Sequence, residues 1–507
     1  MFWKRSPGPA LFCFAISTAI APFVAGAVPA AAMPGVEQAI LSTFEQINMV
    51  PRCSKDETRI SAWLADWARR RTLQVHTDAL DNVLITVPAT PGWENRSAVV
   101  LQAHMDMVCI REEGSAHDFT RDPIPLIRDG DWIHARGTTL GADNGIGVAL
   151  ALTLAEKADT PHPKLELLFT ADEEKDMSGA AGLKPDLFTG RRLINLDSEN
   201  DSVVTLGAAG GIHTDIMLPL DIQVVPAGWE MASVEVSGLL GGHSGMEIGK
   251  NRPNATVLLA QLLAAAGEFR LVEITGGSAD NAIATSAEAT LALPSSVLPE
   301  WELHAASFEK HLRAQYPAET GVKIVLVPAA EAASAATSVT ASAAAVRLIA
   351  DLPQGVVAWS RTFEGLPETS SNVGIVRSSA TALTISSYQR SSDEARLKAL
   401  ASEIAGLAQQ AGASSSQRGG FPAWPPHSQT ALYKAVLSAH AQVTGEQMSS
   451  EVTHAGLECG YFAAKYPDME IVSIGPNIEG VHTTGERLNV PSITKVWKIL
   501  QLVLQAP

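Results

Sequence analysis

The chain has 507 residues, of which 46% are hydrophobic and 18% are charged. This length exceeds what one hydrophobic core holds, so we expect at least two domains, and the composition is ordinary for a soluble globular protein. The 37 basic and 54 acidic residues give a net charge of −17, and no basic cluster is long enough to follow a phosphate backbone, which argues against nucleic acid as a partner.

Residues 1–32 have the pattern of a secretory signal peptide. Two basic residues precede an apolar stretch from about Ala10 to Val24, and small residues suited to a cleavage site follow it. The alternative is an uncleaved membrane anchor, for which the apolar stretch is short. We therefore expect export to a periplasm or the exterior, with no membrane contact after cleavage.

The next elements predict an α/β domain. Residues 35–49 and 58–71 carry apolar side chains at helical spacing, and extended segments follow at 81–87 and 97–104. Further helices and strands then alternate along the chain. This order is typical of a sheet that is largely covered by helices.

The second extended segment ends in a polar pair, His104 and Asp106. Residues two apart on an extended backbone share a face, so Asp106 can accept the spare N–H of the His104 ring and fix which nitrogen faces a metal. Taken alone, the pair is more often a hydrogen-bonded histidine at a strand end.

Asp143 lies in a Gly-rich turn that is followed at once by an apolar helix over Ile146 to Leu154. One interpretation is that Asp143 caps this helix, and the turn considered alone favours it. The other is an acidic metal ligand, delivered by a turn whose glycines allow the backbone to approach closely.

An acidic cluster, Asp172 to Glu174, begins where the buried strand Leu165 to Phe169 ends. Acids crowded against a hydrophobic strand need nearby cations or have raised pKa values. Adjacent side chains on extended backbone point apart, so Glu174 can bind a metal while Glu173 works as a base.

Asp197 ends a further short strand over Leu193 to Leu196. With His104, Asp143 and Glu174 it makes four polar residues at strand or turn ends of one α/β region, where open sheets form their ligand crevice. One imidazole with several carboxylates suits zinc, manganese or cobalt, and a bridging carboxylate allows two ions roughly 3.5 Å apart.

His482 follows the strand Ile471 to Ile474 and is the natural second imidazole, although a loop histidine at this spacing would otherwise be an ordinary surface residue. The last helix is expected after Pro491, with an apolar face that ends at Val503.

The middle of the chain predicts a separate lid domain. We expect the catalytic domain in two parts, 33–210 and 417–507, with the lid or dimerisation domain at 211–416 between them. Ser, Gly and Pro cluster over 414–426 and indicate the return to the first domain. The lid elements expected from the pattern are a strand at 233–236, a helix begun by Pro253, a helix or loop over 329–352 and a strand at 382–388.

The cysteines that follow the predicted signal are Cys53, Cys109 and Cys459. An odd number at wide spacing fits neither a disulfide framework nor a structural zinc site, and such cysteines are mostly buried apolar residues. One disulfide remains possible in an oxidising compartment, and the sequence does not choose its pair.

Several motifs together resemble a known family. They are HMD at 104–106, GADNG at 141–145, ADEE at 171–174, NLDSE at 195–199, GGHSG at 241–245, HAGLECG at 454–460 and the His482 loop. This set is similar to the co-catalytic zinc metallopeptidases, which include carboxypeptidase G, aminoacylase and carnosinase, and within them to the aminoacyl-histidine dipeptidase branch. The resemblance implies an α/β fold, a phosphorylase/hydrolase-like two-metal catalytic domain with an inserted α+β lid domain.

The resemblance also implies residue functions. Asp143 would bridge two ions, and its peptide bond to Asn144 is often cis in this family. Glu173 would be the general base for a metal-activated water, and Asp106 would orient His104. The remaining ligands would be His104 and Asp197 on one ion, and Glu174 and His482 on the other.

Three lid residues are implied as well. His243 would polarise the scissile carbonyl from its own or a partner's lid. Asn281 and Arg390 would hold the substrate's carbonyl and its free C-terminal carboxylate, which an arginine fork can grip at two points. A serine-hydrolase interpretation of Ser244 fails, because Met246 occupies the last glycine position of the G-x-S-x-G motif.

Some features depart from the family. The segment after Asn281 reads AIATSAEA where relatives tend to have Pro-Arg, the His482 loop reads HTTGERL, and the predicted signal peptide is unusual for a cytosolic branch. These departures concern substrate range and compartment more than metal chemistry.

Three hypotheses follow. The first is a two-metal dipeptidase for unblocked dipeptides, including Xaa-His, for which the resemblance implies a homodimer formed through the lid. The second is an N-acyl amino acid hydrolase on the same scaffold. The third is a metal-site protein without turnover, against which the intact Glu173 argues.

Overall fold

The computed structural model describes residues 34–157, 160–329 and 333–506. The predicted signal peptide, residues 1–32, lies outside these described residues. Within them, no helix combines the length and the apolar character needed to cross a membrane.

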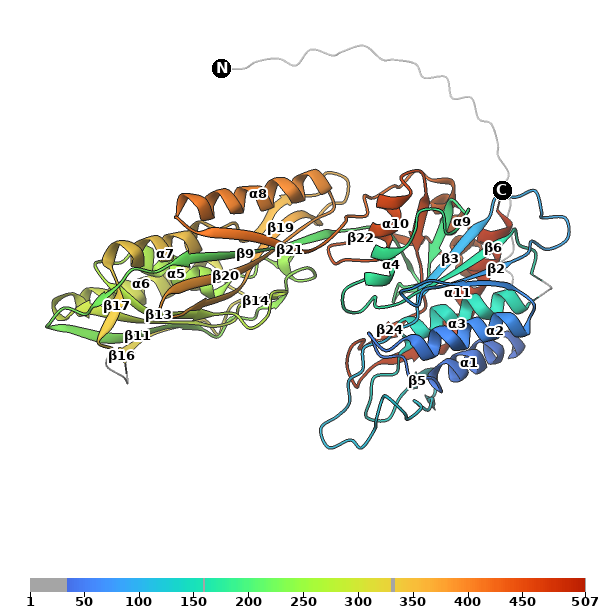
Figure 1. The fold of residues 1–507 in the computed structure, drawn as a ribbon, viewed down its shortest axis with the longest axis horizontal. Coiled ribbons are helices and arrows are strands. Elements are labelled where there is room, and N and C mark those ends of the chain that lie inside the picture. Colours follow the sequence, from blue (N-terminus) through green and yellow to red (C-terminus); the bar gives the residue numbers. More distant parts are fainter. Residues whose placement is uncertain (1–33, 158–159, 330–332, 507) are drawn as a thin grey trace, which may run out of the picture. The chain divides into compact units, whose positions relative to one another are not determined.

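The predicted ligands belong to an eight-stranded sheet with strand order β1-β2-β6-β3-β7-β23-β8-β22. Its four central strands, β6, β3, β7 and β23, are neighbours and run parallel, so their carboxyl ends meet at one edge. Strands from both ends of the chain form this sheet, which therefore contains blue and red ribbons in Figure 1. The strands are β1 (Gln74–Thr77), β2 (Val83–Val87), β3 (Val99–His104), β6 (Leu165–Thr170), β7 (Arg192–Asn195), β8 (Val203–Ala208), β22 (Ser449–Thr453) and β23 (Glu470–Ser473).

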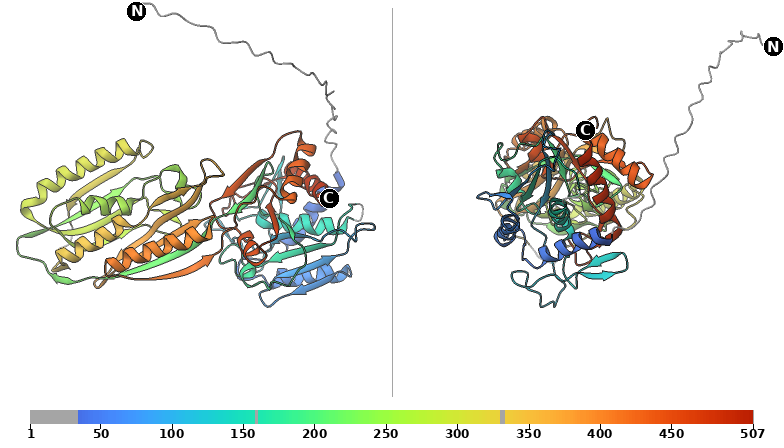
Figure 2. Two further views of the ribbon diagram at one scale, coloured as in Figure 1. Left: turned by 90° about the horizontal axis from the view of Figure 1, so that it is seen from above. Right: turned by 90° about the vertical axis from the view of Figure 1, so that its right-hand side faces the viewer.

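Helices cover this sheet, as the sequence predicts. The helix α3 is buried over most of its length, because its residues from Ile146 to Leu154 are apolar on all sides. The first and last helices, α1 and α11, pack against each other (Figure 2), and the predicted apolar face of α11 is buried down to Val503. The helices are α1 (Pro34–Asn48), α2 (Thr58–Arg70), α3 (Ala142–Glu156), α4 (Ser178–Gly182), α9 (Ala431–Thr444), α10 (Cys459–Lys465) and α11 (Val490–Gln505).

A small four-stranded sheet holds the loop of His482. Its order is β24-β25-β5-β4, and the loop connects the first two strands. The strands are β4 (Ile127–Asp129), β5 (Trp132–His134), β24 (Ile478–Glu479) and β25 (Arg487–Asn489).

The predicted lid has a nine-stranded sheet and a hydrophobic core of its own. Eight strands follow the order β16-β11-β15-β13-β19-β20-β9-β21, and β18 pairs with β19. The strands are β9 (Gly210–Pro219), β11 (Trp229–Ser237), β13 (Arg270–Gly276), β15 (Ala287–Pro294), β16 (Lys323–Pro328), β18 (Gly355–Trp359), β19 (Pro367–Ser378), β20 (Ala382–Ser391) and β21 (Ser414–Phe421). The helices are α5 (Ala255–Ala264), α6 (Leu298–Gln315), α7 (Val339–Asp351) and α8 (Glu394–Gln410).

The Ser- and Gly-rich segment at 414–426 is not simply a linker. Its first part is the strand β21, which pairs with β9 as an edge strand. A strand of Ser and Gly is possible here because an exposed edge strand is held by backbone hydrogen bonds and needs no apolar side chains. Sheet membership changes between β8 and β9 and again between β21 and β22, while the boundaries at 210 and 416 stay predictions.

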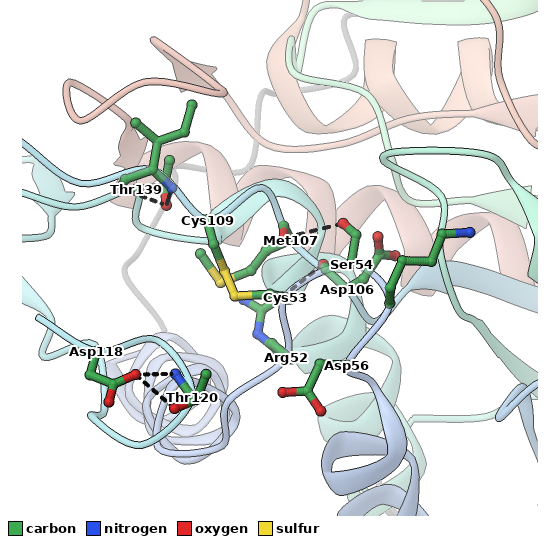
Figure 3. The surroundings of a disulfide bond; sticks show 12 residues. Arg52, Cys53, Ser54, Asp56, Asp106, Met107, Cys109, Asp118, Thr120 and Thr139 are labelled. Carbon is green, nitrogen blue, oxygen red and sulfur yellow. Dashed lines mark hydrogen bonds between the residues drawn. A yellow bond between two sulfur atoms is a disulfide. The ribbon is translucent and has the colours of Figure 1, made fainter.

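The structure selects one cysteine pair that the sequence left open. Cys53 and Cys109 form a disulfide, whereas Cys459 is a buried free cysteine. Cys53 also forms a backbone bridge with Met107, and Figure 3 shows the disulfide beside these residues and Arg52. The disulfide therefore joins the segment before α2 to the segment that follows His104.

Candidate metal centre

The five predicted ligands come together at the carboxyl edge of the parallel strands. His104 is the last residue of β3, while Glu174 and Asp197 follow β6 and β7. Asp143 lies in the first turn of α3, and His482 lies in the loop after β24. Their donor atoms form two groups, each within 4.8 Å, and Asp143 belongs to both: one with His104 and Asp197, the other with Glu174 and His482.

The two oxygens of Asp143 face different imidazoles. Oδ1 lies 3.0 Å from His104 Nε2, and Oδ2 lies 3.4 Å from His482 Nε2. His104 Nε2 is also 3.3 Å from Asp197 Oδ1, and His482 Nε2 is 2.9 Å from Glu174 Oε2. This is the arrangement that a carboxylate bridging two cations requires.

Asp106 lies on the far side of the His104 ring. Its Oδ1 is 3.3 Å from His104 Nδ1, within ion-pair distance, and both side chains are almost completely buried. The same carboxylate accepts the backbone N–H groups of Glu173 at 3.0 Å and Glu174 at 3.3 Å. Asp106 thus holds the imidazole and the acidic loop in one arrangement, with His104 Nε2 toward the ligand group.

Glu173 is close to this centre. Its carboxylate forms a third donor group with the Glu174 carboxylate and the His104 imidazole. Burial raises its pKa well above the ordinary value, and the negative charges of Asp197 and Glu174 add to the shift. A carboxyl group in such surroundings accepts a proton readily, which is what a general base does.

The carboxylates are crowded. Burial raises the pKa of Asp197 to about 6, against the opposing effect of His104, and burial with the negative charges of Asp143 and Asp197 raises that of Glu199 to about 7. Hydrogen bonds with Asp143 and Glu174 raise the pKa of His482 to about 11. A positive charge is therefore favoured where the two groups meet.

The donor set fits divalent metal ions. Each group offers one imidazole nitrogen and two carboxylates, a combination that suits zinc, manganese or cobalt. Glu174 Oε1 is buried without a hydrogen-bond partner among the described residues. A buried carboxylate oxygen in that state is costly unless it meets a cation.

The turn before α3 places Asp143. The N-cap position of α3 is Gly141, in the left-handed conformation at φ 71°, so Asp143 does not cap the helix. A Cβ on Gly141 would lie 2.4 Å from Arg52 Nη2, which is why this position needs glycine. The peptide bond between Asp143 and Asn144 is cis, as the family resemblance implies.

The sequence did not reveal Arg52, a buried residue just before α2. Its guanidinium donates to the backbone oxygens of Asp106 at 2.9 Å and Gly141 at 2.6 Å, and to Asn48 Oδ1 at 3.1 Å. Burial lowers its pKa to about 10, which leaves it charged at neutral pH. No residue pattern could have predicted this function of Arg52, because two of its partners are backbone carbonyls, which every residue has.

Glu458, from the HAGLECG motif, is a second buried group that the sequence did not single out. Its Oε2 accepts hydrogen bonds from Gln102 Nε2 at 2.7 Å and Thr170 Oγ1 at 2.6 Å. Burial raises its pKa to about 8, with a further contribution from Asp197. It lies beneath the ligand edge and is held by side chains of β3 and β6.

The three predicted lid residues are not part of the ligand groups. His243 is half-buried, its Nδ1 accepts the Met246 N–H at 3.2 Å, and burial lowers its pKa. Arg390 is 4% exposed and lies over the Tyr388 ring at 4.2 Å, and its Nε has no hydrogen-bond partner among the described residues. Asn281 is exposed. Their functions stay predictions.

Known proteins are similar to this chain in sequence and in fold. The profile of "Peptidase family M20/M25/M40" matches residues 100–506. The cytosol non-specific dipeptidase of Escherichia coli K12 is 36% identical over 471 residues, which are 92% of this chain and 97% of that protein. The aminoacylhistidine dipeptidase of Vibrio alginolyticus superposes with a TM-score of 0.87 at 34% identity, covering 94% of this chain and 97% of that one. A tripeptidase of Staphylococcus aureus, at 15% identity and a TM-score of 0.54 over 92% of this chain and 98% of that one, shares the fold.

One prediction is wrong in the light of these relatives. We expected export to a periplasm or the exterior, whereas the name of the Escherichia coli relative places that protein in the cytosol. The signal-peptide interpretation rested on residues 1–32, a short apolar stretch behind two basic residues. Such a pattern reports composition over a few turns and is a weak guide to compartment.

Proposed function

The chain belongs to peptidase family M20/M25/M40, and we propose that it is a two-metal dipeptidase that hydrolyses unblocked dipeptides, Xaa-His among them. The observation that carries this proposal is the shared Asp143, whose oxygens face two separate donor groups. The substrate class is inferred from the relatives, since one is named a non-specific dipeptidase and the other an aminoacylhistidine dipeptidase.

The proposed metals are two divalent ions, zinc by preference, with manganese and cobalt as alternatives. When bound, they would supply the positive charge that acidifies a water molecule and polarises the scissile carbonyl. His104, Asp143 and Asp197 would hold one ion. Asp143, Glu174 and His482 would hold the other.

Glu173 is the proposed general base. Its raised pKa suits a group that takes a proton from the attacking water and returns it to the leaving amine. Asp106 supports this function from behind, because it accepts the Glu173 backbone N–H and faces His104 Nδ1. Proton transfer and ligand orientation would thus depend on the same buried carboxylate.

The lid is proposed to recognise the substrate. Arg390 is buried, charged and without a partner at Nε among the described residues, which suits a group that awaits a carboxylate. Asn281 would hold the substrate's carbonyl group, and His243 would polarise the carbonyl of the scissile peptide bond. We also propose a homodimer through the lid, which sedimentation of the purified chain would test.

The direct test is hydrolysis. The purified chain, reloaded with zinc or manganese, is offered β-alanyl-histidine, a small dipeptide panel and N-acetyl amino acids, with EDTA-treated protein as the control. We expect dipeptide cleavage that EDTA abolishes and metal restores.

Two outcomes would contradict the proposal. Cleavage of N-acetyl amino acids alone would mean that the chain is an acyl amino acid hydrolase. Binding of two metal equivalents without turnover of any substrate would mean that it is a metal-site protein.

A further inference from the structure

Glu486 is a buried acidic residue in the same hairpin loop as His482. Glu486 is only 2% exposed, although the loop itself is at the surface. Two hydrogen bonds close the loop, from Thr483 Oγ1 to the Gly480 oxygen at 2.7 Å and from the Gly485 N–H to Thr483 Oγ1 at 3.1 Å. A short closed segment therefore fixes Glu486 relative to His482.

The Glu486 carboxylate accepts four consecutive backbone N–H groups. Oε2 accepts those of Leu140 at 2.7 Å and Gly141 at 3.0 Å. Oε1 accepts those of Ala142 at 2.7 Å and Asp143 at 3.2 Å. N–H groups at the beginning of a helix have no partner within it, and their partial positive charge favours an anion. One side chain thus holds the start of the helix that carries Asp143.

Arg52 also holds this turn. It donates to the Gly141 oxygen at 2.6 Å, while Glu486 accepts the Gly141 N–H. The two peptide groups that flank Gly141 are therefore both fixed by buried charged side chains. Arg52 reaches on to the Asp106 oxygen, whereas Glu486 alone continues into the His482 loop.

We propose that Glu486 is a positioning residue that sets the separation between His482 and the carboxylate of Asp143. The inference rests on the proposed two-metal centre, because the separation affects hydrolysis only if both residues bind ions. Without the four hydrogen bonds, the His482 loop is no longer joined to the turn. The metal position that includes His482 should then lose its geometry first, because the strands β3 and β7 still hold His104 and Asp197.

Three substitutions separate this function from general stabilisation. Glu486→Gln keeps the shape of the side chain. Its NH2 group would face two backbone N–H donors, from which an NH2 group cannot accept a hydrogen bond. Glu486→Asp keeps the charge on a side chain one methylene shorter. The control is Glu479→Gln in the same hairpin, where the carboxylate is 53% exposed and pairs with Arg487. It removes an equal charge without touching the turn.

The experiment titrates the metal-free full-length chain and each variant with Co²⁺, counts bound metal and records the visible absorption spectrum. We expect two equivalents in the wild type and in Glu479→Gln. In Glu486→Gln one equivalent, assigned to the position that includes His482 and called the weaker one, should bind about 10- to 100-fold less tightly. A loss of this size is usual when a residue that orients metal ligands is removed. The tighter equivalent and its spectrum should change little. Turnover, measured separately, should fall with the weaker equivalent.

The outcomes distinguish the two proposals. A wild type that binds fewer than two equivalents overturns the two-metal function, and this inference with it. A wild type with two equivalents and a Glu486→Gln variant that matches it in both affinities and in spectrum overturns the inference alone. If Glu486→Gln does not fold, Glu486→Asp decides: selective weakening of one equivalent supports positioning, and equal affinities or equal weakening of both refutes it.

Discussion

The disulfide between Cys53 and Cys109 should stabilise the chain mainly through its unfolded state. The two cysteines are 56 residues apart in the sequence, and closing a loop of that length removes about 4 kcal/mol of chain entropy from the unfolded ensemble at 25 °C. The folded backbone does not depend on the bridge, because the Met107 N–H donates to the Arg52 oxygen at 3.1 Å and the Ser54 N–H to the Met107 oxygen at 3.3 Å. The double variant Cys53→Ser/Cys109→Ser should therefore keep near-normal turnover at low temperature.

The assay is urea unfolding of the oxidised wild type, the reduced wild type and the double serine variant. Cysteines stay reduced in a reducing compartment. The oxidised form is therefore prepared first, and the loss of two free thiols is verified by thiol titration before the comparison. Reduction should lower the free energy of unfolding of the wild type by up to about 4 kcal/mol and leave that of the double variant unchanged. A difference between oxidised wild type and double variant below about 1 kcal/mol would refute the reasoning, as would an effect of reductant on the variant.

Three further predictions concern single side chains. Glu173→Gln should keep both metal equivalents and lower kcat by about 10²- to 10⁴-fold, and near-normal turnover of the metal-loaded variant would remove Glu173 as the base. His243→Ala should lower kcat by about 10²-fold or more, so an intact kcat would exclude a carbonyl-polarising function. Burial, then the charge of Arg390, lowers the pKa of His454 to about 3 from its usual 6.5, so the unfolded chain binds more protons between these values. Stability should accordingly fall as the pH drops through that window, by at most about 1.4 kcal/mol per pH unit, and His454→Gln should flatten this dependence in acid unfolding of the metal-free chain.

The proposed ligands could be located in the sequence because a hydrophobic run ends at or just before several of them. His104 ends one short buried strand and Asp197 follows another, and these strands prove to be parallel neighbours. Parallel neighbours bring their carboxyl ends to one edge, so residues far apart in sequence become one site. The apolar runs thus predicted both the fold class and the place of the proposed metal centre.

The residues that hold the ligands could not be predicted in the same way. Arg52 binds a backbone oxygen 89 residues away, and Glu486 binds a backbone N–H 345 residues away, both at Gly141. Every residue has such backbone groups, so the partner leaves no mark in the sequence. The disulfide is a similar case, since the pairing of Cys53 with Cys109 follows from the backbone bridge to Met107 and not from spacing.

The metal centre combines two opposing demands on its carboxylates. Burial excludes water, and it raises the pKa of Asp197 to about 6, so the charged form is costly when the site is formed by the protein alone. The same cost creates affinity for cations, because each bound positive charge removes a repulsion that folding has imposed. Rigid supports are then required, since a loose loop would relieve the repulsion by moving its carboxylate into solvent. Arg52 and Glu486 oppose that movement around Asp143, because both hold the backbone of its turn although neither touches a proposed ligand side chain.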